Sequence, residues 1–354
     1  MATRAIDSGR TVLANKYNQG KLFFYEHFQE VVVDTTDISA LVSASHDLNL
    51  AEDSGVQKVA RELDNACKEA GFFYVKGHGI PDSLLNEVKN VVQNFFDLPY
   101  EEKVKIKLSP ATGYRGYQRI GENITLGKPD IQEAIDCYRP MEPGEYGTLG
   151  ETMEGQNLWP EYPPNFRSLM EEYIILLKEL AKKIMRGIAL ALGGPSDAFD
   201  GEIAGDSFWA MRLIGYPGSY DATSQRIKCS IGCGAHSDYG LLTLINQDDN
   251  VDALQVRNKS GEWIWVVPIP GTFICNIGDM LKVCSNGIYD ATLHKVINNS
   301  YKYRVSVVFF YEPNYNTTVE PLEFCKLKTG GVGSFQGVIY GKHLVHKVKA
   351  NFGL

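Results

Sequence analysis

From about residue 207 onward the chain is a series of short β-rich runs separated by turns, and this pattern constrains the fold more than any other feature. The runs are SFWAMRLIGYP, IKCSIG, GLLTLINQ, ALQVRN, EWIWVVPIP, TFICNIGD, ATLHKVINN and YRVSVVFFYEP. Eight short strands at this spacing are typical of a sandwich, a jelly roll or a barrel. We therefore expect an all-β core in this half of the chain.

The preceding half shows helical periodicity. The apolar spacing within 56–71 predicts a helix that ends at Gly71, and a strand with a turn is expected at 72–81. A second helix is expected from Asp82, which can cap it, and the longest one over 166–194. This half is therefore expected to support the β-rich half with helices.

Two segments of the first half lack such a period. VVVDTTDISAL (31–41) is expected to form a short strand that leads into a loop. The segment 109–130 is rich in Gly, Tyr and polar residues, and we expect a long loop of the kind that often lines a site. The expected divisions are an N-terminal arm (1–28), an N-terminal region with the substrate loop (29–165), a supporting long helix and linker (166–206), the β core (207–320) and a C-terminal segment (321–354).

Composition excludes several classes of partner. The 354 residues carry a net charge of −8 and no Lys/Arg cluster, which argues against binding to nucleic acid or to an anionic membrane. The seven cysteines are scattered without a Cys-x-x-Cys pair, which favours a reducing compartment. Because the N-terminal stretch also lacks the apolar segment of a signal peptide, we expect a cytoplasmic protein. No pattern indicates an oligomeric state.

A candidate metal site begins in the stretch GAHSDYGLLTLI. His236 and Asp238 are two positions apart, so on a strand both side chains would point to the same face. A structural His–Asp hydrogen bond is the commoner reading of such a pair. His294, 56 residues after Asp238 in a later β-rich run, favours a metal. Two histidines and one carboxylate leave coordination positions open, as in non-haem iron(II) oxygenases, although zinc hydrolases can use the same ligands.

A second polar pair lies in the last β-rich run. Arg304 and Ser306 share one face of an otherwise apolar strand. A buried guanidinium without a partner is costly, so a partner is expected. That partner is either an internal carboxylate or a small dicarboxylate, which Arg304 would bind through two hydrogen bonds with Ser306 as a further donor.

In this order and spacing, His236-Ser-Asp238, His294 and Arg304-Val-Ser306 resemble the isopenicillin N synthase-like branch of the iron(II)/2-oxoglutarate-dependent dioxygenases. The resemblance covers most of the chain. CKEAGFFYVKGHGIP and FFDLPYEEK are similar to the N-terminal region of that branch, and GLLTLINQDD, GEWIWVVPIPGTFICNIGD and FFYEPN to its core. GENITLGKPD and the later YGKH are similar to a subgroup that includes ethylene-forming enzymes and plant relatives.

The resemblance implies a double-stranded β-helix (jelly-roll) core with a helical N-terminal region, and it implies roles for the polar residues. His236, Asp238 and His294 would bind Fe(II), and Arg304, Ser306 and Tyr216 would hold the distal carboxylate of 2-oxoglutarate. The family's Asn-x-Tyr motif has Ile214 in place of its Asn here. Molecular oxygen would be the second cosubstrate, with ascorbate as a supporting reductant. The implied reaction hydroxylates or desaturates a small molecule and releases succinate and CO2.

Contacts to that small molecule are expected from residues outside these motifs. Phe310 matches a family aromatic that faces the substrate, although an aromatic on an apolar strand is otherwise ordinary core. The loop at 113–123 offers Tyr117, Glu122 and Asn123, for which solvated loop positions are the alternative. Arg212 could contact a carboxylate or form an ordinary ion pair.

Two rival functions remain open at this point. An iron oxidase of the isopenicillin N synthase type would take its electrons from the substrate itself, with the Arg–Ser pair binding a substrate carboxylate. A non-catalytic jelly-roll binding protein is the second alternative, and an intact His–Asp–His set argues against it because a binding module needs no open metal positions.

Overall fold

A computed structural model of the chain describes residues 33–44, 50–218 and 230–351, together with the backbone of four two-residue strands. These four strands form two small antiparallel pairs, β1 (Ile6–Asp7) with β2 (Arg10–Thr11) and β10 (Tyr220–Asp221) with β11 (Arg226–Ile227). Apart from β1 and β2, the expected N-terminal arm (1–28) lies outside the described residues. The five expected divisions of the chain stay a prediction.

The expected strands of the second half are all present. They are β9 (Trp209–Tyr216), β12 (Ser230–His236), β13 (Leu242–Gln247), β14 (Leu254–Arg257), β15 (Trp263–Trp265), β16 (Phe273–Ile277), β17 (His294–Asn298) and β18 (Arg304–Tyr311). The first half adds β3 (Thr35–Asp37), β4 (Phe72–Lys76), β5 (Gly116–Gln118), β6 (Ile124–Thr125), β7 (Lys128–Pro129) and β8 (Glu133–Tyr138), and the C-terminal part adds β19 (Thr318–Val319) and β20 (Val338–Ile339).

Most of these strands form two sheets. The larger sheet has the order β3-β4-β16-β13-β18-β9-β8-β5, and the smaller has the order β12-β17-β14-β15. Apolar side chains from both sheets, among them Ile245 of the larger and Leu254 of the smaller, share one buried cluster. The two sheets therefore pack face to face as a sandwich. Strands from both halves of the chain belong to the larger sheet, so the two halves share one core.

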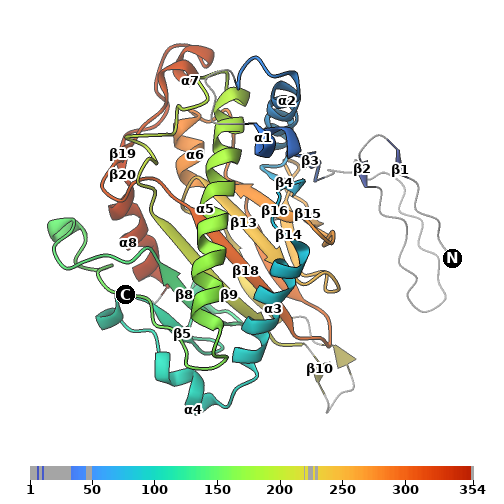
Figure 1. Cartoon of the computed structure of the whole chain (residues 1–354), viewed down its shortest axis with the longest axis vertical. Coiled ribbons are helices and arrows are strands. Elements are labelled where there is room, and N and C mark those ends of the chain that lie inside the picture. The colour runs from blue at the N-terminus through green and yellow to red at the C-terminus, as the bar shows by residue number, and fades with distance from the viewer. Residues whose placement is uncertain are drawn as a thin grey trace.

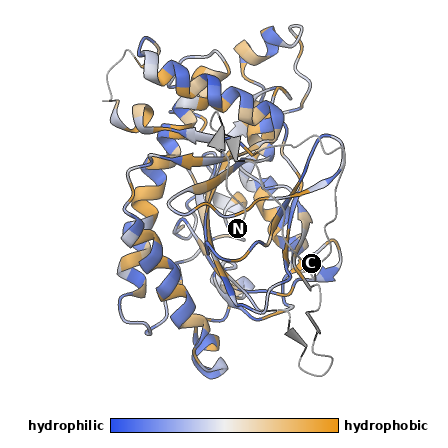
Figure 2. Ribbon diagram, turned by 90° about the vertical axis from the view of Figure 1, so that its right-hand side faces the viewer, coloured by the Kyte–Doolittle hydropathy of each residue, from blue (hydrophilic) through white to orange (hydrophobic). Residues whose placement is uncertain are grey.

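The other face of the larger sheet is covered by helices. These are α1 (Ser39–Ser43), α2 (Ser54–Glu69), α3 (Asp82–Phe96) and α5 (Phe166–Ala191), and α5 runs lengthwise in front of β8, β9, β13 and β18 (Figure 1). The shorter helices are α4 (Tyr100–Lys103), α6 (Asp279–Cys284), α7 (Glu323–Lys328) and α8 (Tyr340–Asn351). Hydrophobic and hydrophilic stretches alternate along the helices (Figure 2), as amphipathic helices on a sheet require.

Local sequence explains where these helices begin and how closely they pack. The Asp53 carboxylate accepts a hydrogen bond from the Val56 backbone N–H (2.9 Å) and caps α2. Gly187 of α5 lies so close to α1 and α2 that an added Cβ would be 2.9 Å from side-chain carbons of both Leu41 and Leu63. A glycine at this position therefore allows the helices to approach each other.

Strand β18 shows how one strand serves two layers. Val305, Val307, Phe309 and Tyr311 face the helices and belong to the larger apolar cluster. Arg304, Ser306, Val308 and Phe310, on the opposite face, line a cavity between the sheets. Because side chains alternate along a strand, the polar residues of this strand are delivered to the cavity and the apolar ones to the core.

Three local expectations need correction. Residues 39–41, expected to belong to a loop, are part of α1, because the backbone turns back to pack Leu41 against α2 and α5. The segment 109–130 is not a single loop, since Gly116–Gln118 pairs with β8 and joins the larger sheet. Asp82 does not cap α3: it is the first helical residue, and Pro81 occupies the cap position. Within the described parts of the chain, no helix has the length and hydropathy needed to cross a bilayer.

Replacing Ile184 by Ala should lower the free energy of unfolding by about 2–5 kcal/mol, because it leaves a cavity between α5 and its neighbours. Ile184 is 0% exposed, whereas Ile175 on the same helix is 64% exposed. The matched change Ile175→Ala should therefore cost less than about 0.5 kcal/mol. Urea denaturation followed by circular dichroism measures both values, and equal costs would contradict the packing described here.

Candidate metal centre and active-site cavity

One cavity lies between the two sheets and collects most of the polar residues singled out from the sequence. Its lining includes His236, Asp238, His294, Arg304, Ser306 and Tyr216, together with apolar side chains such as Ile245, Leu254, Val296 and Val308. C-terminal helix α8 contributes Leu344, Val348 and Asn351 to the same lining. Polar groups that are far apart in the sequence thus face a common, mainly apolar space.

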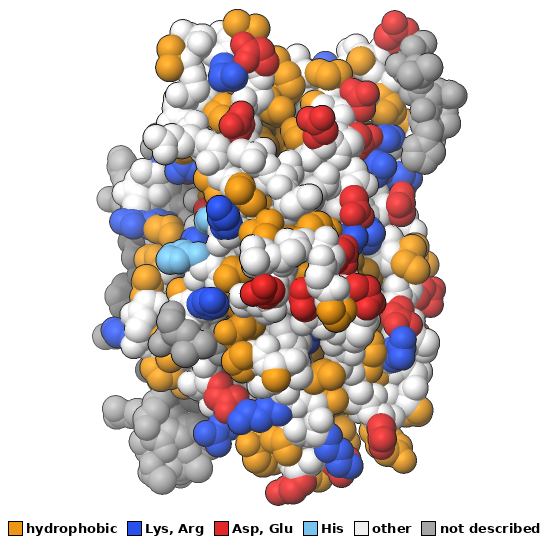
Figure 3. Space-filling model, turned by 90° about the vertical axis from the view of Figure 1, so that its left-hand side faces the viewer, with side chains coloured by type: hydrophobic (Ala, Val, Ile, Leu, Met, Phe, Trp, Pro, Cys, Tyr) orange, Lys and Arg blue, Asp and Glu red, His pale blue; other side chains and the backbone are white. Residues whose placement is uncertain are grey.

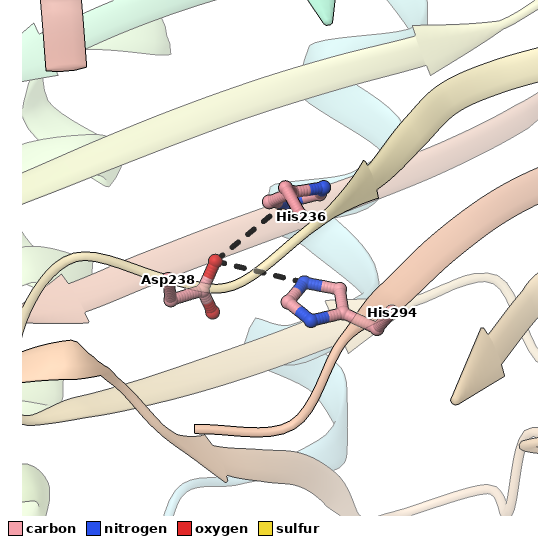
Figure 4. A group of neighbouring side chains, drawn as sticks. All are labelled: His236, Asp238 and His294. Carbon is pink, nitrogen blue, oxygen red and sulfur yellow. Dashed lines mark ion pairs between the residues drawn. The ribbon is translucent and has the colours of Figure 1, made fainter. Parts of the chain in front are cut away.

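The pairing of β12 with β17 brings the two histidines together. His236 is the last residue of β12 and His294 the first of β17, and the two are direct cross-strand partners. Their ring centroids are 4.3 Å apart. Asp238 does not lie on the strand, as the sequence interpretation assumed, but in the turn just after it. Its carboxylate nevertheless points between the rings (Figure 4), with Oδ1 3.7 Å from His236 Nε2 and 3.6 Å from His294 Nε2.

The three side chains are oriented by neighbouring hydrogen bonds. Oδ2 of Asp238 accepts hydrogen bonds from Thr243 Oγ1 (2.6 Å) and Asn276 Nδ2 (2.7 Å), so that Oδ1 is left for the histidines. Nδ1 of His236 lies 2.8 Å from the Gly234 carbonyl oxygen, and Nδ1 of His294 lies 3.2 Å from the Thr292 carbonyl oxygen. These contacts leave both Nε2 atoms directed at the same point. Such outer contacts are typical of metal-binding histidines and carboxylates.

The electrostatics of the three residues also suit a cation. Burial opposes ionisation of Asp238, but His294, His236 and the two hydrogen bonds outweigh it and hold the pKa of the carboxyl below its ordinary value. Burial and the neighbouring His236 lower the pKa of His294 to about 4, which keeps this imidazole neutral. For His236, burial is outweighed by Cys233 and Asp238, which raise its pKa to about 10 and favour a positive charge on or beside the ring.

The ligand atoms of His236, Asp238 and His294 all lie within 4.8 Å of one another. Two imidazole nitrogens and one carboxylate oxygen at this spacing form the facial donor set that suits iron(II) and leaves positions open for other ligands. The residues present therefore fit a metal ion.

A cationic end of the cavity lies along β18. Arg304 is 1% exposed, and its guanidinium lies over the Tyr216 ring at 4.9 Å from the ring centroid. Nη2 donates a hydrogen bond to Oε1 of Gln247, whereas the buried Nε and Nη1 have no hydrogen-bond partner among the described residues. A buried guanidinium with unused donors is costly, and a carboxylate that accepts from it removes that cost. The internal carboxylate that the sequence left open as a partner is not found among the described residues.

Sheet register sets the neighbours of this guanidinium. Arg304 is the cross-strand partner of Tyr216 on β9, and Ser306 is the partner of Ile214 on one side and of Gln247 on the other. Ser306 and Tyr216 are both almost fully buried. Both residues line the cavity together with Arg304.

The residues suggested as substrate contacts separate into two groups. Phe310, Arg212 and Asn123 line the cavity. Tyr117 and Glu122 do not: Tyr117 donates a hydrogen bond to buried Glu133 (2.7 Å) on another side of the sheet. Glu122 forms an ion pair with Arg119 (3.1 Å). Side chains of this one segment therefore face different parts of the molecule, and only Asn123 of the three faces the cavity.

Sequence reasoning missed the residues that orient the site. Thr243, Asn276 and Gln247 each occur as a polar residue within or at the end of a buried strand. Their position could have marked them as residues with a buried partner, because a polar side chain inside an apolar strand needs a hydrogen bond. Which of them faces the metal ligands depended on the register of β13 against β16 and β18.

The metal-site geometry predicts that Asp238→Ala weakens binding of iron(II), or of cobalt(II) as a probe, by about 100-fold or more, because it removes the anionic ligand and leaves two neutral donors. Calorimetric titration with the metal measures the affinity. The matched control Asp197→Ala changes an exposed carboxylate and should leave the affinity unchanged. Equal affinities for the Asp238 variant and the parent chain would remove this residue from the ligand set.

Comparisons with known proteins agree with this site. Residues 35–162 match the family described as non-haem dioxygenase in morphine synthesis N-terminal, and residues 208–313 match the 2OG-Fe(II) oxygenase superfamily. A homoarginine-6-hydroxylase of Oryza sativa subsp. japonica is 63% identical over 89% of this chain and 96% of its own length. A 1-aminocyclopropane-1-carboxylate oxidase of Dictyostelium mucoroides is 36% identical over 79% of this chain and 82% of its own.

Solved structures show the same fold. A full-length Neurospora crassa protein, crystallised with alpha-KG and thymine, is 26% identical, with a TM-score of 0.76 over 92% of this chain and 98% of that one. JOX2, crystallised with 2OG, Fe and JA, is 29% identical, with a TM-score of 0.67 over 89% of this chain and 84% of that one. The expected jelly-roll core is thereby confirmed. The chain belongs to the iron(II)- and 2-oxoglutarate-dependent oxygenase superfamily, in its isopenicillin N synthase-like branch, and is a 2-oxoglutarate-dependent dioxygenase that oxidises a small molecule.

Proposed function

We propose that His236, Asp238 and His294 bind the iron(II) of this enzyme and that Arg304, Ser306 and Tyr216 bind the distal carboxylate of 2-oxoglutarate. The shared direction of the Nε2 and Oδ1 atoms supports the first assignment. The unpartnered Nε and Nη1 of Arg304 support the second. Iron(II) bound there supplies the redox chemistry that couples decarboxylation of 2-oxoglutarate to succinate with oxidation of the substrate by O2.

The protein's own contribution is orientation and exclusion of water. Arg304, oriented by its hydrogen bond to Gln247, fixes one end of the cosubstrate together with Ser306 and Tyr216. Val308 and Phe310 follow on the same face of β18, between the guanidinium and the far end of the cavity. An apolar wall at this position keeps water away from the reacting groups.

We propose further that the substrate is homoarginine and that its C6 is hydroxylated. The observation that carries this proposal is the similarity to four proteins named homoarginine-6-hydroxylase. They come from Oryza sativa subsp. japonica, Glycine max and Arabidopsis thaliana (two proteins), and are 63%, 61%, 59% and 53% identical over 89%, 89%, 90% and 95% of this chain. 2-Oxoglutarate donates electrons to O2 alongside the substrate, so the substrate need not supply all of them, unlike the substrate of an oxidase of the isopenicillin N synthase type.

The cavity offers a complement to the amino-acid end of such a substrate. Nε of Arg212 lies 3.5 Å from Oδ1 of Asp136, and both residues line the cavity. Burial raises the pKa of Asp136, and Arg212 opposes that rise. Asn123 accepts a hydrogen bond from Arg212 Nη2 (3.1 Å) and so helps to orient it. We propose that this pair receives the α-carboxylate and α-ammonium groups, with Phe310 against the aliphatic part.

The same proposal includes the compartment. The six described cysteines (67, 137, 233, 275, 284 and 325) are all free thiols, five of them buried. This usage supports a reducing compartment, and we propose the cytoplasm.

Arg304→Ala should raise the KM for 2-oxoglutarate by about 100-fold, because the distal carboxylate loses its charged partner within a buried site. Steady-state succinate release measures this KM. The control Arg167→Ala removes a guanidinium that is 66% exposed on α5 and should leave the KM unchanged. An unchanged KM in the Arg304 variant would assign that guanidinium another role.

The substrate proposal is tested with purified protein, iron(II), 2-oxoglutarate, ascorbate, O2 and homoarginine. We expect succinate release to depend on homoarginine, together with a product oxidised at C6: either the carbinolamine, heavier by one oxygen atom, or the guanidine and C6 aldehyde into which it breaks down. Mass spectrometry and isotope-edited NMR detect this product. Turnover of a different small molecule, with none of homoarginine, would overturn the substrate proposal and leave the dioxygenase activity standing.

A further inference from the structure

Among the described residues, three carboxyl groups line the cavity: those of Asp136, Asp238 and Glu312. The proposed function gives roles to the first two and none to Glu312. It follows β18 directly and continues the face that carries Arg304, Ser306, Val308 and Phe310. Its side chain is buried, with the residue only 2% exposed. Its Oε2 atom has no hydrogen-bond partner among the described residues.

The charges of the cavity leave Glu312 without a counterion. Asp136 is paired with Arg212 at 3.5 Å. Asp238 lies between two histidines at a proposed metal site, and Arg304 is assigned to the cosubstrate. No Lys or Arg of the described residues forms an ion pair with Glu312. A buried carboxylate without a cation is costly, and burial accordingly raises the pKa of Glu312 to about 8, a rise that Tyr340 opposes.

The carboxylate also lies close to the metal-binding turn. A Cβ atom on Gly240 would overlap the Glu312 carboxylate, so this carboxylate packs directly against a position only two residues after Asp238. The Asp238 carboxylate contributes to the raised pKa of Glu312, which places the two charges within electrostatic reach. The Glu312 carboxyl group is thus next to the turn that positions the candidate metal, and a cation bound beside it would favour its ionised form.

We propose that Glu312 binds the cationic group attached to the carbon that is oxidised. The inference rests on the proposed function and specifies its chemistry. In homoarginine, C6 is bonded directly to a guanidino nitrogen, so a substrate that presents C6 to the metal also brings the guanidinium beside the metal-binding turn. A carboxylate at that position pairs with guanidinium through charge-assisted hydrogen bonds.

Surface charge on the side of the molecule shown in Figure 3 does not provide this selection. The face that carries α8 shows acidic and basic side chains interspersed with apolar ones (Figure 3), so that no field of one sign covers it. Discrimination between a cation and a neutral group of the same shape therefore belongs to the buried carboxylate, where the local dielectric is low.

The test compares homoarginine with homocitrulline, in which a neutral ureido group replaces the guanidinium at nearly the same shape. We expect the parent enzyme to prefer homoarginine. Glu312→Gln, which keeps the shape and removes the charge, should lower kcat/KM for homoarginine by about 30-fold or more. The same change should alter kcat/KM for homocitrulline by less than about threefold, so that the preference collapses.

Controls separate this role from a structural one. Glu69→Gln, an exposed change on α2, should preserve the preference, and Glu312→Asp should retain part of it. Thermal unfolding, cobalt(II) affinity and the 2-oxoglutarate KM should be the same for Glu312→Gln and the parent. A Glu312→Gln enzyme that loses stability or metal binding but keeps the substrate preference would overturn the inference and make Glu312 a support for Tyr340 and α8.

Failure of the proposed substrate is a separate outcome. If the parent enzyme turns over another amino acid whose oxidised carbon carries an ammonium or guanidinium, lysine being the first candidate, the homoarginine proposal fails. The Glu312 inference is then tested on that amino acid and its neutral amide analogue. If the parent enzyme accepts only substrates that are uncharged at this position, the Glu312 inference is overturned.

Discussion

The cross-strand pairing of β12 with β17 is the constraint on which the candidate site depends. It makes His236 and His294 direct neighbours although 57 residues separate them in the chain. The carboxylate of Asp238 is added by the turn that ends β12, and Thr243 and Asn276 hold its second oxygen. A shift of this pairing by one residue would turn one imidazole away from the cavity, because side chains alternate between the faces of a strand.

The larger sheet separates a dry apolar core on one of its faces from a cavity with polar groups on the other. One face of β18 packs against α3 and α5, and the other presents a guanidinium and a hydroxyl to the space between the sheets, where the carboxyl of Glu312, the next residue along the chain, also lies. Each of these buried polar groups carries a cost of desolvation, which a ligand or a neighbour must offset. Arg304 has Tyr216 and Gln247 beside it and still has unused donors. The cavity is therefore complementary to ligands that bring charge of the opposite sign.

Particular residues show how far sequence reasoning reached. The eight β-rich runs all became strands, because alternation and turn residues act over short distances. The family resemblance implied that Arg304 and Tyr216 lie together, and the register of β9 with β18 places them opposite each other. Tyr117 and Glu122 were grouped with the site because they share a segment with Asn123. A polar, aperiodic segment gives no information about which of its side chains face inward, and these two face elsewhere.

The sequence by itself determined the periodicities, the residue types of the metal and cosubstrate motifs, and the membership of a family that those motifs indicate. Tertiary structure alone decided the partners: the hydrogen bonds of Thr243 and Asn276 to Asp238, the contact of Gln247 with Arg304, and the burial of Glu312 away from any cation among the described residues. The physical reason is that these contacts join strands far apart in sequence. Their existence depends on sheet register and on burial, which are properties of the whole packed molecule and leave no local pattern in the chain.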